Sequence, residues 1–233
     1  SGGGFKNIRI ADCTVRSPEG TEVTFGRQRG LAGIALELVD GGQLENVDVG
    51  NVDIDGVSVA VFIRLGNRAR IYGKGETPGV GTLRNVALHN IKAAHTSDIG
   101  CSITGLPGHN VENIVLRNIA VAFDGGGERK AVDREIPERA ESYPESIMFG
   151  MLPAYGFFCR HVRNLVFENI TLSLHKADFR HAMVFDDVAN LQVDKFRADS
   201  PKGAAPLLRL DHVQQALIRH SHVPETAEAF VAV

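Results

Sequence analysis

One eight-residue pattern recurs along the chain and restricts the fold more than any other feature. Each copy has asparagine or, once, glutamine in the third place, alternating apolar residues after it, and usually a second asparagine five positions later. The copies occupy residues 5–12, 44–51, 83–90, 111–118, 162–169 and 188–195, with a degraded copy at 213–220. Apolar and polar alternation is the period of a half-buried strand, so each copy predicts a β-strand.

The copies return at intervals that suit a solenoid. Their first asparagines fall at positions 7, 46, 85, 113, 164 and 190, with Gln215 in the seventh place. The shortest intervals, about 25 residues, match one coil of a solenoid, and the longer ones imply insertions at the turns. We therefore expect an all-β, single-stranded parallel β-helix of about seven coils that spans residues 1–233 as one domain.

The repeated asparagines predict contacts between neighbouring coils. A side-chain amide both donates and accepts, so asparagines stacked on successive coils are able to bond to one another and to the backbone. A buried amide without a partner costs about 1–3 kcal/mol, which makes such a ladder a determinant of register. A β-sandwich with asparagine turns is the alternative, but it predicts no fixed five-residue spacing.

The two ends of the pattern differ. Lys195 and His220 replace the second asparagine in the last copies, and we expect residues 200–233 to form a degenerate coil that caps the stack. The first copy is intact, and no capping sequence precedes it. Because an open coil exposes strand edges, we expect missing N-terminal coils, a partner chain or self-association at that end.

The longest insertion between copies covers residues 124–158. It begins with Asp124 and three glycines, continues with a charged stretch at 128–141 that has room for a short helix, and ends in an aromatic part. Long loops in compact domains are mostly functional or disordered. The aromatic and proline content of the second half favours an ordered loop laid over one face.

Composition excludes several functional classes. A formal net charge of −3 argues against a nucleic-acid partner, and the absence of an 18-residue apolar run argues against a membrane partner. The opening residues lack the layout of a signal peptide, which leaves the compartment open. Cys13, Cys101 and Cys159 are too few and too scattered for a disulfide framework or a zinc site. We interpret them as buried small hydrophobic residues and expect no metal or cofactor.

Several phrases resemble glycoside hydrolase family 28, the polygalacturonase-like family of the pectin-lyase superfold, and its bacterial branch in particular. They are the opening Ser1 to Ile8 and the stretches at 33–42, 62–68, 103–109, 148–157 and 185–188, in the family's order. The resemblance extends to about Ala198. It implies a right-handed parallel β-helix, the C-terminal part of an inverting hydrolase of pectic or related polysaccharide, in a family often secreted or periplasmic.

The family's catalytic motifs have no counterpart in this chain. Its Asn-Thr-Asp motif, its Asp-Asp pair in matching context and its Gly-His-Gly motif are absent, and Asp186-Asp187 comes too late and predicts a turn between coils. Ala35-Leu36-Glu37 stands where the family places the Arg-x-Lys motif that binds the substrate carboxylate. We therefore predict no catalytic residue and expect the chain alone to be inactive.

Seven residues are candidates for substrate contact. Arg64, Asn67 and Arg68 follow a predicted strand and suit a carboxylate, with a solvated turn as the alternative. The others are His109 as a hydroxyl partner or a loop-ordering residue, Tyr155 for stacking on a sugar or packing of the loop, and Glu37 and Glu145 as hydroxyl acceptors.

Three functions agree with these features. The first is a partial polygalacturonase-like hydrolase whose partner is a pectic, uronate-containing oligo- or polysaccharide. The second is a non-catalytic carbohydrate-binding module or pseudo-enzyme. The third is an assembly element that docks through its open first coil.

Overall fold

The computed structural model describes residues 3–17, 26, 28–71, 73 and 75–233, so Ser1 and Gly2 of the opening phrase lie outside it. The described chain is all-β, with a single turn of 3-10 helix, η2 (Arg129–Ala131). Its strands are β1 (Gly4–Arg16), β2 (Ala32–Leu38), β3 (Gln43–Asp55), β4 (Val59–Leu65), β5 (Thr82–Thr96), β6 (Cys101–Thr104), β7 (Val111–Phe123), β8 (Ala154–Leu174), β9 (His181–Ala198), β10 (Leu208–Asp211), β11 (Gln214–Arg219) and β12 (Val231–Ala232).

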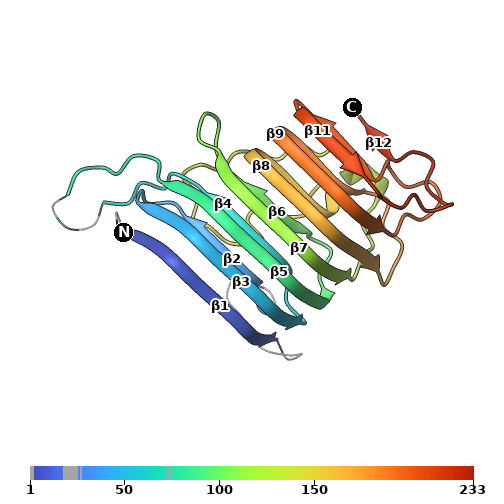
Figure 1. The fold of residues 1–233 in the computed structure, drawn as a ribbon, viewed down its shortest axis with the longest axis horizontal. Coiled ribbons are helices and arrows are strands. Elements are labelled where there is room, and N and C mark those ends of the chain that lie inside the picture. Colours follow the sequence, from blue (N-terminus) through green and yellow to red (C-terminus); the bar gives the residue numbers. More distant parts are fainter. Residues whose placement is uncertain (1–2, 18–25, 27, 72, 74) are drawn as a thin grey trace.

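These strands form one long parallel sheet that turns back on itself. The order is β1-β3-β5-β7-β8-β6-β4-β2, and every pairing between these strands is parallel. β8 joins the two halves because its first part pairs with β6 and its second part with β7. β9 does the same with β10 and β11. We call the β1-β3-β5-β7 side the front face and the β2-β4-β6 side the rear face (Figure 1).

Asparagines form the corners of the front-face strands. The ten repeated asparagines all have positive φ, between 54° and 59°. This left-handed conformation is unfavourable for most residues with a Cβ atom, but asparagine tolerates it better than others. The five-residue spacing of the asparagines is therefore the spacing between two corners of one strand.

The same asparagines form two hydrogen-bonded ladders across the strands. Each amide nitrogen of the first ladder donates to the preceding side-chain oxygen at 2.7–2.9 Å, through Asn7, Asn46, Asn85, Asn113, Asn164 and Asn190. The second ladder starts at Asp12. Both ladders lie at the surface, whereas the sequence argument treats the amides as buried. Water competes there, so each bond contributes about 0.5–1.5 kcal/mol or less.

The core lies between the front and rear faces. Alternate residues of each strand point inward, and β4 to β9 supply side chains that are almost fully buried. Phe157 and Phe185 both contact Phe167 edge-on, with ring centroids 5.2 and 5.9 Å apart. Cys101 and Cys159 are buried in this core as predicted, but Cys13 on β1 is only half-buried, which corrects the expectation for that residue.

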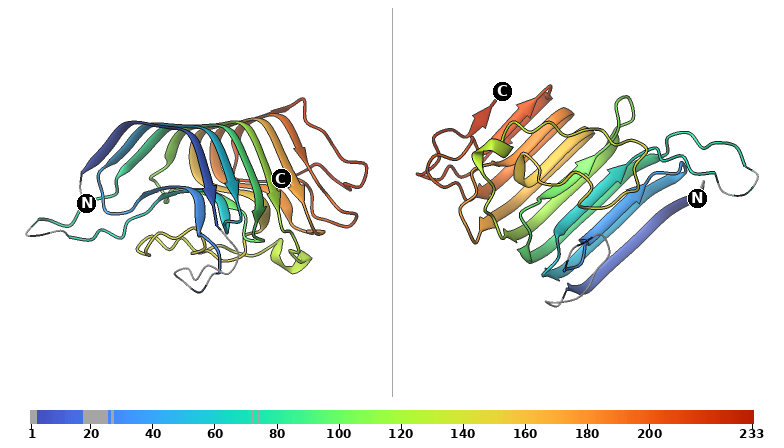
Figure 2. Two further views of the ribbon diagram at one scale, coloured as in Figure 1. Left: turned by 90° about the horizontal axis from the view of Figure 1, so that it is seen from below. Right: turned by 180° about the vertical axis from the view of Figure 1, so that it is seen from behind.

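The predicted insertion is an ordered segment over the rear face (Figure 2). It contains η2 but no strand until β8 begins at Ala154, so the insertion ends before residue 158. Several of its side chains are buried, among them Ile136, Phe149 and Leu152. We call residues 128–150 the covering segment. At the C-terminal end, residues 200–233 hold three short strands, and β11 keeps mostly exposed side chains.

Candidate functional site

The outward side chains of the rear face form one row of polar and charged groups. Strand register places each of them beside the next, and the adjacent residues Leu36, Ile103 and Phe185 point into the core. We call this the charged row; its members are Glu37, Arg64, Thr104, Arg160, Asp186 and Asp211. Because outward positions of parallel strands align, residues far apart in sequence become neighbours here.

The covering segment rests on the middle of the charged row. The Arg64 guanidinium donates to Gly105 O at 3.0 Å and to Glu138 O at 2.7 Å, and it lies 5.5 Å from the centroid of the Phe149 ring. Arg64 is 1% exposed, and burial lowers its pKa to about 10, so it stays cationic at neutral pH. Arg64 therefore attaches the covering segment to the sheet. Neither prediction for this residue, a contact with a substrate carboxylate or a place in a solvated turn, describes that role.

Arg160 makes a second attachment. Its Nη1 donates to Ile136 O at 2.6 Å and pairs with Glu138 at 3.2 Å. The adjacent His161 lies between two carboxylates, with Nδ1 2.6 Å from Asp187 and Nε2 3.2 Å from Glu138. Asp187 has a positive φ of 52°, which agrees with the predicted turn at this position. These contacts close the middle of the row to solvent.

Glu37 stands at the β2 end of the row, where its side chain remains exposed. Partial burial of the carboxyl group and repulsion from the nearby Glu145 raise the pKa of Glu37 to about 7. Burial also raises the pKa of Glu145, which belongs to the covering segment. Two nearby carboxyl groups whose pKa values are both raised are a recurrent feature of functional sites. At pH 7 Glu37 is partly protonated and therefore both donates and accepts hydrogen bonds.

Arg68 and Asp40 form an ion pair that also contacts the covering segment. The Arg68 guanidinium binds the Asp40 carboxylate through two nitrogens, with Nε 3.0 Å from Oδ1. It also lies 5.2 Å from the centroid of the Tyr143 ring, which belongs to the covering segment. Asp40 is 5% exposed and accepts the backbone N–H of Arg70 as well. Arg68 is therefore already neutralised.

The remaining candidates lie apart from the Glu37–Glu145 pair. Asn67 donates its backbone N–H to Ala140 O at 2.7 Å, whereas its side-chain Oδ1 is buried and unpartnered. His109 is an exposed residue of a tight turn that two backbone hydrogen bonds to Leu106 close. Tyr155 is 1% exposed and donates its hydroxyl to Asp199 O at 2.6 Å, so of its two alternatives packing describes it.

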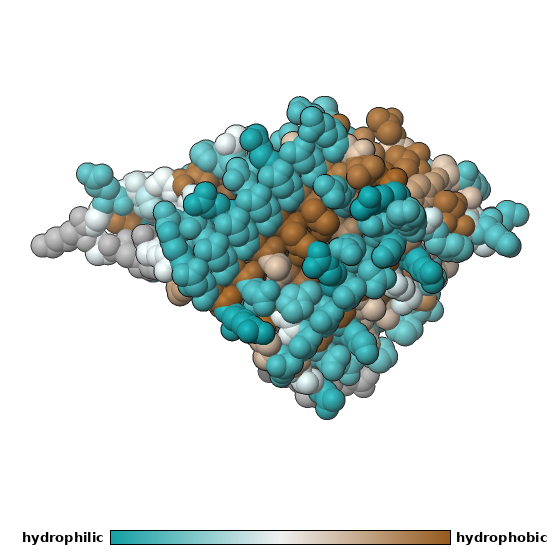
Figure 3. Space-filling view, viewed as in Figure 1, coloured by the Kyte–Doolittle hydropathy of each residue, from teal (hydrophilic) through white to brown (hydrophobic). Residues whose placement is uncertain are grey.

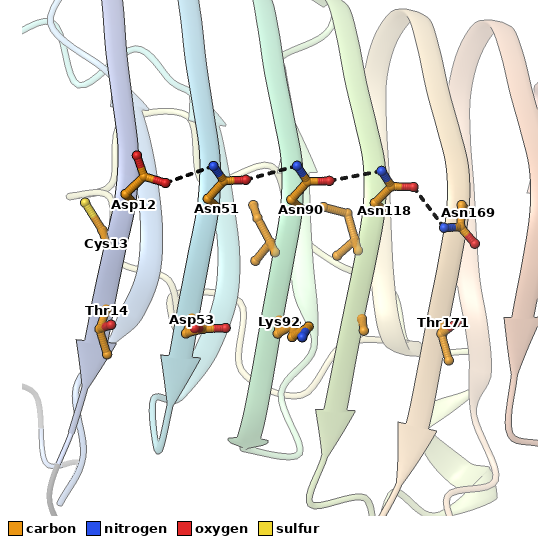
Figure 4. Close-up of a pocket in the computed structure, with 13 residues that line it drawn as sticks. Asp12, Cys13, Thr14, Asn51, Asp53, Asn90, Lys92, Asn118, Asn169 and Thr171 are labelled. Atoms are coloured by element: carbon orange, nitrogen blue, oxygen red, sulfur yellow. Dashed lines mark hydrogen bonds between the residues drawn. The ribbon is translucent and has the colours of Figure 1, made fainter.

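A shallow cavity of about 710 Å³ lies on the front face, along the second asparagine ladder (Figure 4). The ladder runs from Asp12 through Asn51, Asn90, Asn118 and Asn169 with bonds of 2.8–3.0 Å. An apolar band separates hydrophilic rows on this face (Figure 3). The ladder amides already bond to each other, and the two carboxyl groups whose pKa burial raises, Glu37 and Glu145, lie at the rear face.

Among the described residues, no group of three histidine, cysteine or carboxylate side chains is arranged to hold a metal ion. No helix of the described chain is long and apolar enough to cross a membrane.

Glu37 and Glu145 are separate candidates in the sequence, and 108 positions separate them, so their interaction depends on the fold. Residues 208–211 alternate between buried leucines and polar residues, which indicates that Asp211 points outward. Phe158 and Val184 are also apolar and buried, so no such alternation marks Arg160 and Asp186. The register between strands, however, appears only in the fold.

No protein-family model, no curated protein and no solved structure matches this chain.

Proposed function

We propose that this chain is the C-terminal part of a polygalacturonase-like polysaccharide hydrolase of glycoside hydrolase family 28. In this proposal the parallel sheet is a right-handed β-helix of about seven coils, and the chain contributes a substrate-contact surface without the catalytic aspartates. The ordered parallel sheet and the phrases quoted above support it, and so does the open rear-face surface around Glu37.

The Glu37–Glu145 pair is the observation that carries the proposal. Carbohydrate hydroxyl groups act as both donors and acceptors, and Glu37, whose pKa is about 7, offers both functions at neutral pH. Its side chain is exposed on the outward surface of the rear face. A protonated carboxyl beside an ionised one binds a hydroxyl in either direction.

The same chemistry defines the part of the ligand that is contacted. Glu37 occupies the place where the resemblance puts a cation, and Arg68 is already paired with Asp40. The pair repels a uronate carboxylate once both groups ionise. We therefore expect contact through sugar hydroxyls of a pectic oligosaccharide, and tighter binding below pH 7 than above it.

Binding of a tetragalacturonate, measured by calorimetry at pH 5.5 and pH 8, tests this proposal. We expect weaker binding at pH 8 than at pH 5.5, and at least fivefold loss at pH 5.5 in Glu37→Ala with Glu145→Ala, which removes both hydroxyl partners. Asp53→Asn, an exposed carboxylate on the front face, serves as the matched control. Equal binding by the double variant and the parent chain contradicts the site.

A reducing-sugar assay tests the absence of catalysis. We expect no product from polygalacturonate above a blank, because the chain has no motif for the acid and base that inverting hydrolysis uses. Product release that Glu37→Gln abolishes would instead assign the pair a catalytic role.

Exposed apolar groups on β1 favour a second candidate function, assembly with another copy of the chain. Phe5 aligns with Leu44, and Ile10 aligns with Val49, and both partners are core residues. Phe5 is nevertheless 59% exposed and Ile10 is 43% exposed. Two copies related by a two-fold axis could cover these positions with the same surface of each.

A further inference from the structure

We propose that a cavity at the β9–β10 end of the charged row is a second carbohydrate subsite, which takes one neutral sugar ring. The cavity measures about 250 Å³ and opens between the rear face and residues 133–136. Arg160, Asp186, Arg209 and Asp211 supply polar groups, and Phe158 and Val184 supply apolar surface. Apolar surface with a few polar groups is the usual composition of a small-molecule site.

Arg160 brings an unsatisfied donor to this cavity. The residue is only 6% exposed, and its two terminal nitrogens bind Ile136 O, Pro137 O and Glu138. Its Nε, however, is buried and has no hydrogen-bond partner. Buried donors are nearly always paired in native proteins, so an unpaired one in a cavity wall points to a bound group with an acceptor. A sugar hydroxyl oxygen is such an acceptor.

A second unsatisfied buried atom belongs to His181, which does not line the cavity but interacts electrostatically with three residues that do. It is 2% exposed and places Nδ1 2.6 Å from Pro206 O, which leaves Nε2 buried without a partner. Because a carbonyl only accepts, Nδ1 carries the hydrogen, and Nε2 is an acceptor in the neutral ring. Burial lowers the pKa of His181, which keeps it neutral, and the nearby charged groups Arg209, Asp133 and Asp211 all line the cavity.

The charges of the cavity favour a neutral ligand over an anion. Four carboxylates and three guanidinium groups line it, a net formal charge of −1. Arg160 is paired with Glu138, and Arg209 lies 2.6 Å from Asp211. The third guanidinium, Arg134, donates to the carbonyl oxygens of Met151 and Phe149, so each of the three cations already has hydrogen-bond acceptors. Asp186 is partly exposed and lies 3.6 Å from His212. It is available to accept from a hydroxyl.

The size of the cavity limits the ligand. At about 250 Å³ it is smaller than the range of about 300–1,000 Å³ typical for drug-sized ligands. One pyranose ring fits a cavity of this volume, and a disaccharide is too large for it. A ligand with about a dozen non-hydrogen atoms is expected to bind in the millimolar range.

This subsite takes its ligand class from the proposed function but uses different residues. Arg64 and Thr104 stand between Glu37 and Arg160 in the charged row, and they separate the two sites. The two sites are therefore tested by different variants, and one can fail while the other binds.

NMR titration of the ¹⁵N-labelled chain at pH 7 tests the subsite directly. The probes are methyl β-D-galactopyranoside and methyl β-D-galactopyranosiduronate, which differ only in oxidation at C6. We expect the neutral glycoside to shift the Arg160 Nε–H signal saturably in the millimolar range, and the uronate to bind at least fivefold more weakly. No saturable shift with the neutral glycoside, or equal binding of both probes, overturns the proposal.

Asp186→Asn is the matched variant because it keeps the shape of the side chain and removes its charge. We expect at least fivefold weaker binding of the neutral glycoside, with an unchanged unfolding midpoint as the check on the fold. Glu37→Gln, at the other end of the row, is expected to leave this titration unchanged. Unchanged binding in Asp186→Asn, or loss of binding in Glu37→Gln, counts against the site.

Discussion

Arg180 and Asp178 form an ion pair with no solvent exposure on either side chain. Arg180 Nη1 also donates to Leu152 O at 3.0 Å, and Nη2 donates to Asp98 O at 2.7 Å. Asp178 accepts the backbone N–H of Gly127 at 2.8 Å. The pair therefore joins the turn before β6, the start of the insertion and the segment before β8.

Replacing one member of this pair is expected to destabilise the chain strongly. Arg180→Met leaves the Asp178 charge buried without compensation, which costs about 3–5 kcal/mol. The double variant with Asp178→Asn should recover part of that loss. Urea unfolding measures both. Arg117→Met, which breaks an exposed pair with Glu168, serves as the control and should cost under about 1 kcal/mol. A small effect of Arg180→Met would contradict this account.

The Glu37 carboxyl makes stability depend on pH. Its pKa is about 7 in the folded chain and about 4.5 as a free side chain, so the folded state binds the proton more tightly. This contribution is fully present below pH 4.5 and is lost as the pH rises through 7. Because Glu37 is solvent-exposed, we discount the shift to about 1 kcal/mol.

Glu37→Gln should remove this dependence. The variant is expected to match the parent near pH 4.5 and to exceed its stability by about 1 kcal/mol at pH 8. Urea midpoints at both pH values measure the difference. Glu76→Gln, at an exposed position, is the control. A stability difference between variant and parent that stays constant from pH 4.5 to pH 8 would show that burial and repulsion from Glu145 do not raise the pKa of Glu37.

At the scale of the strand, the asparagine corners combine two roles. Asn118 has a φ of 56°, donates to Asn90 at 3.0 Å and accepts from Asn169 at 2.8 Å. The backbone conformation favours asparagine or glycine, and the ladder bonds favour asparagine alone. This combination explains why the same residue type returns at each corner.

Substitutions of Asn118 separate these roles. Asn118→Gly loses the ladder bonds but accepts the positive φ, whereas Asn118→Ala loses the bonds and also incurs about 1–2 kcal/mol of backbone strain. We therefore expect the alanine variant to be less stable than the glycine variant by about 1 kcal/mol. Denaturant unfolding decides the order. Equal stability would show that the corner conformation contributes little.

At the scale of the whole molecule, β1 leaves part of the core uncovered. Ile8, Cys13 and Val15 are half-buried, whereas Val52 and Ile54 on the neighbouring β3 are each 3% exposed. Within the described residues, β1 pairs only with β3, so its other edge has free backbone groups. Such an edge is a template for pairing with another strand.

Sedimentation velocity across a concentration series tests this surface. We expect reversible dimers, and we expect Ile10→Lys to weaken the dimerisation at least tenfold because it places a charge in the apolar contact. Leu217→Lys on β11, where Leu217 is 48% exposed, is the matched control and should still dimerise. A chain that stays monomeric throughout the series contradicts the assembly candidate.

Local signals were enough to predict the strands and the asparagine ladders. Residues such as Asn46 and Asn51 determine the backbone conformation at their own positions, and alternation around them determines which side chains are apolar. The bonds between neighbouring asparagines follow once parallel strands stack in register. The exposure of Phe5 also follows from its place in the first copy.

Arg64 and Tyr155 illustrate what local patterns leave undetermined. Both residues follow apolar stretches, a position typical of a surface loop. In the structure the covering segment buries Arg64, and the core encloses Tyr155. Burial of Arg64 depends on Glu138, 74 positions further along the chain, and burial of Tyr155 depends on packing in the core. Composition and motif spacing do not indicate which distant segments of the chain pack against one another.

The sequence by itself determined the all-β class, the corner positions and the asparagine ladders, because each depends on the preferences of single residues and on a short repeat. Only the tertiary structure decided that Glu37 meets Glu145 and that Arg160, Asp186 and Asp211 share a cavity. Those groups meet because strand register and the covering segment bring distant parts of the chain together, and pKa shifts depend on distance in space and on burial.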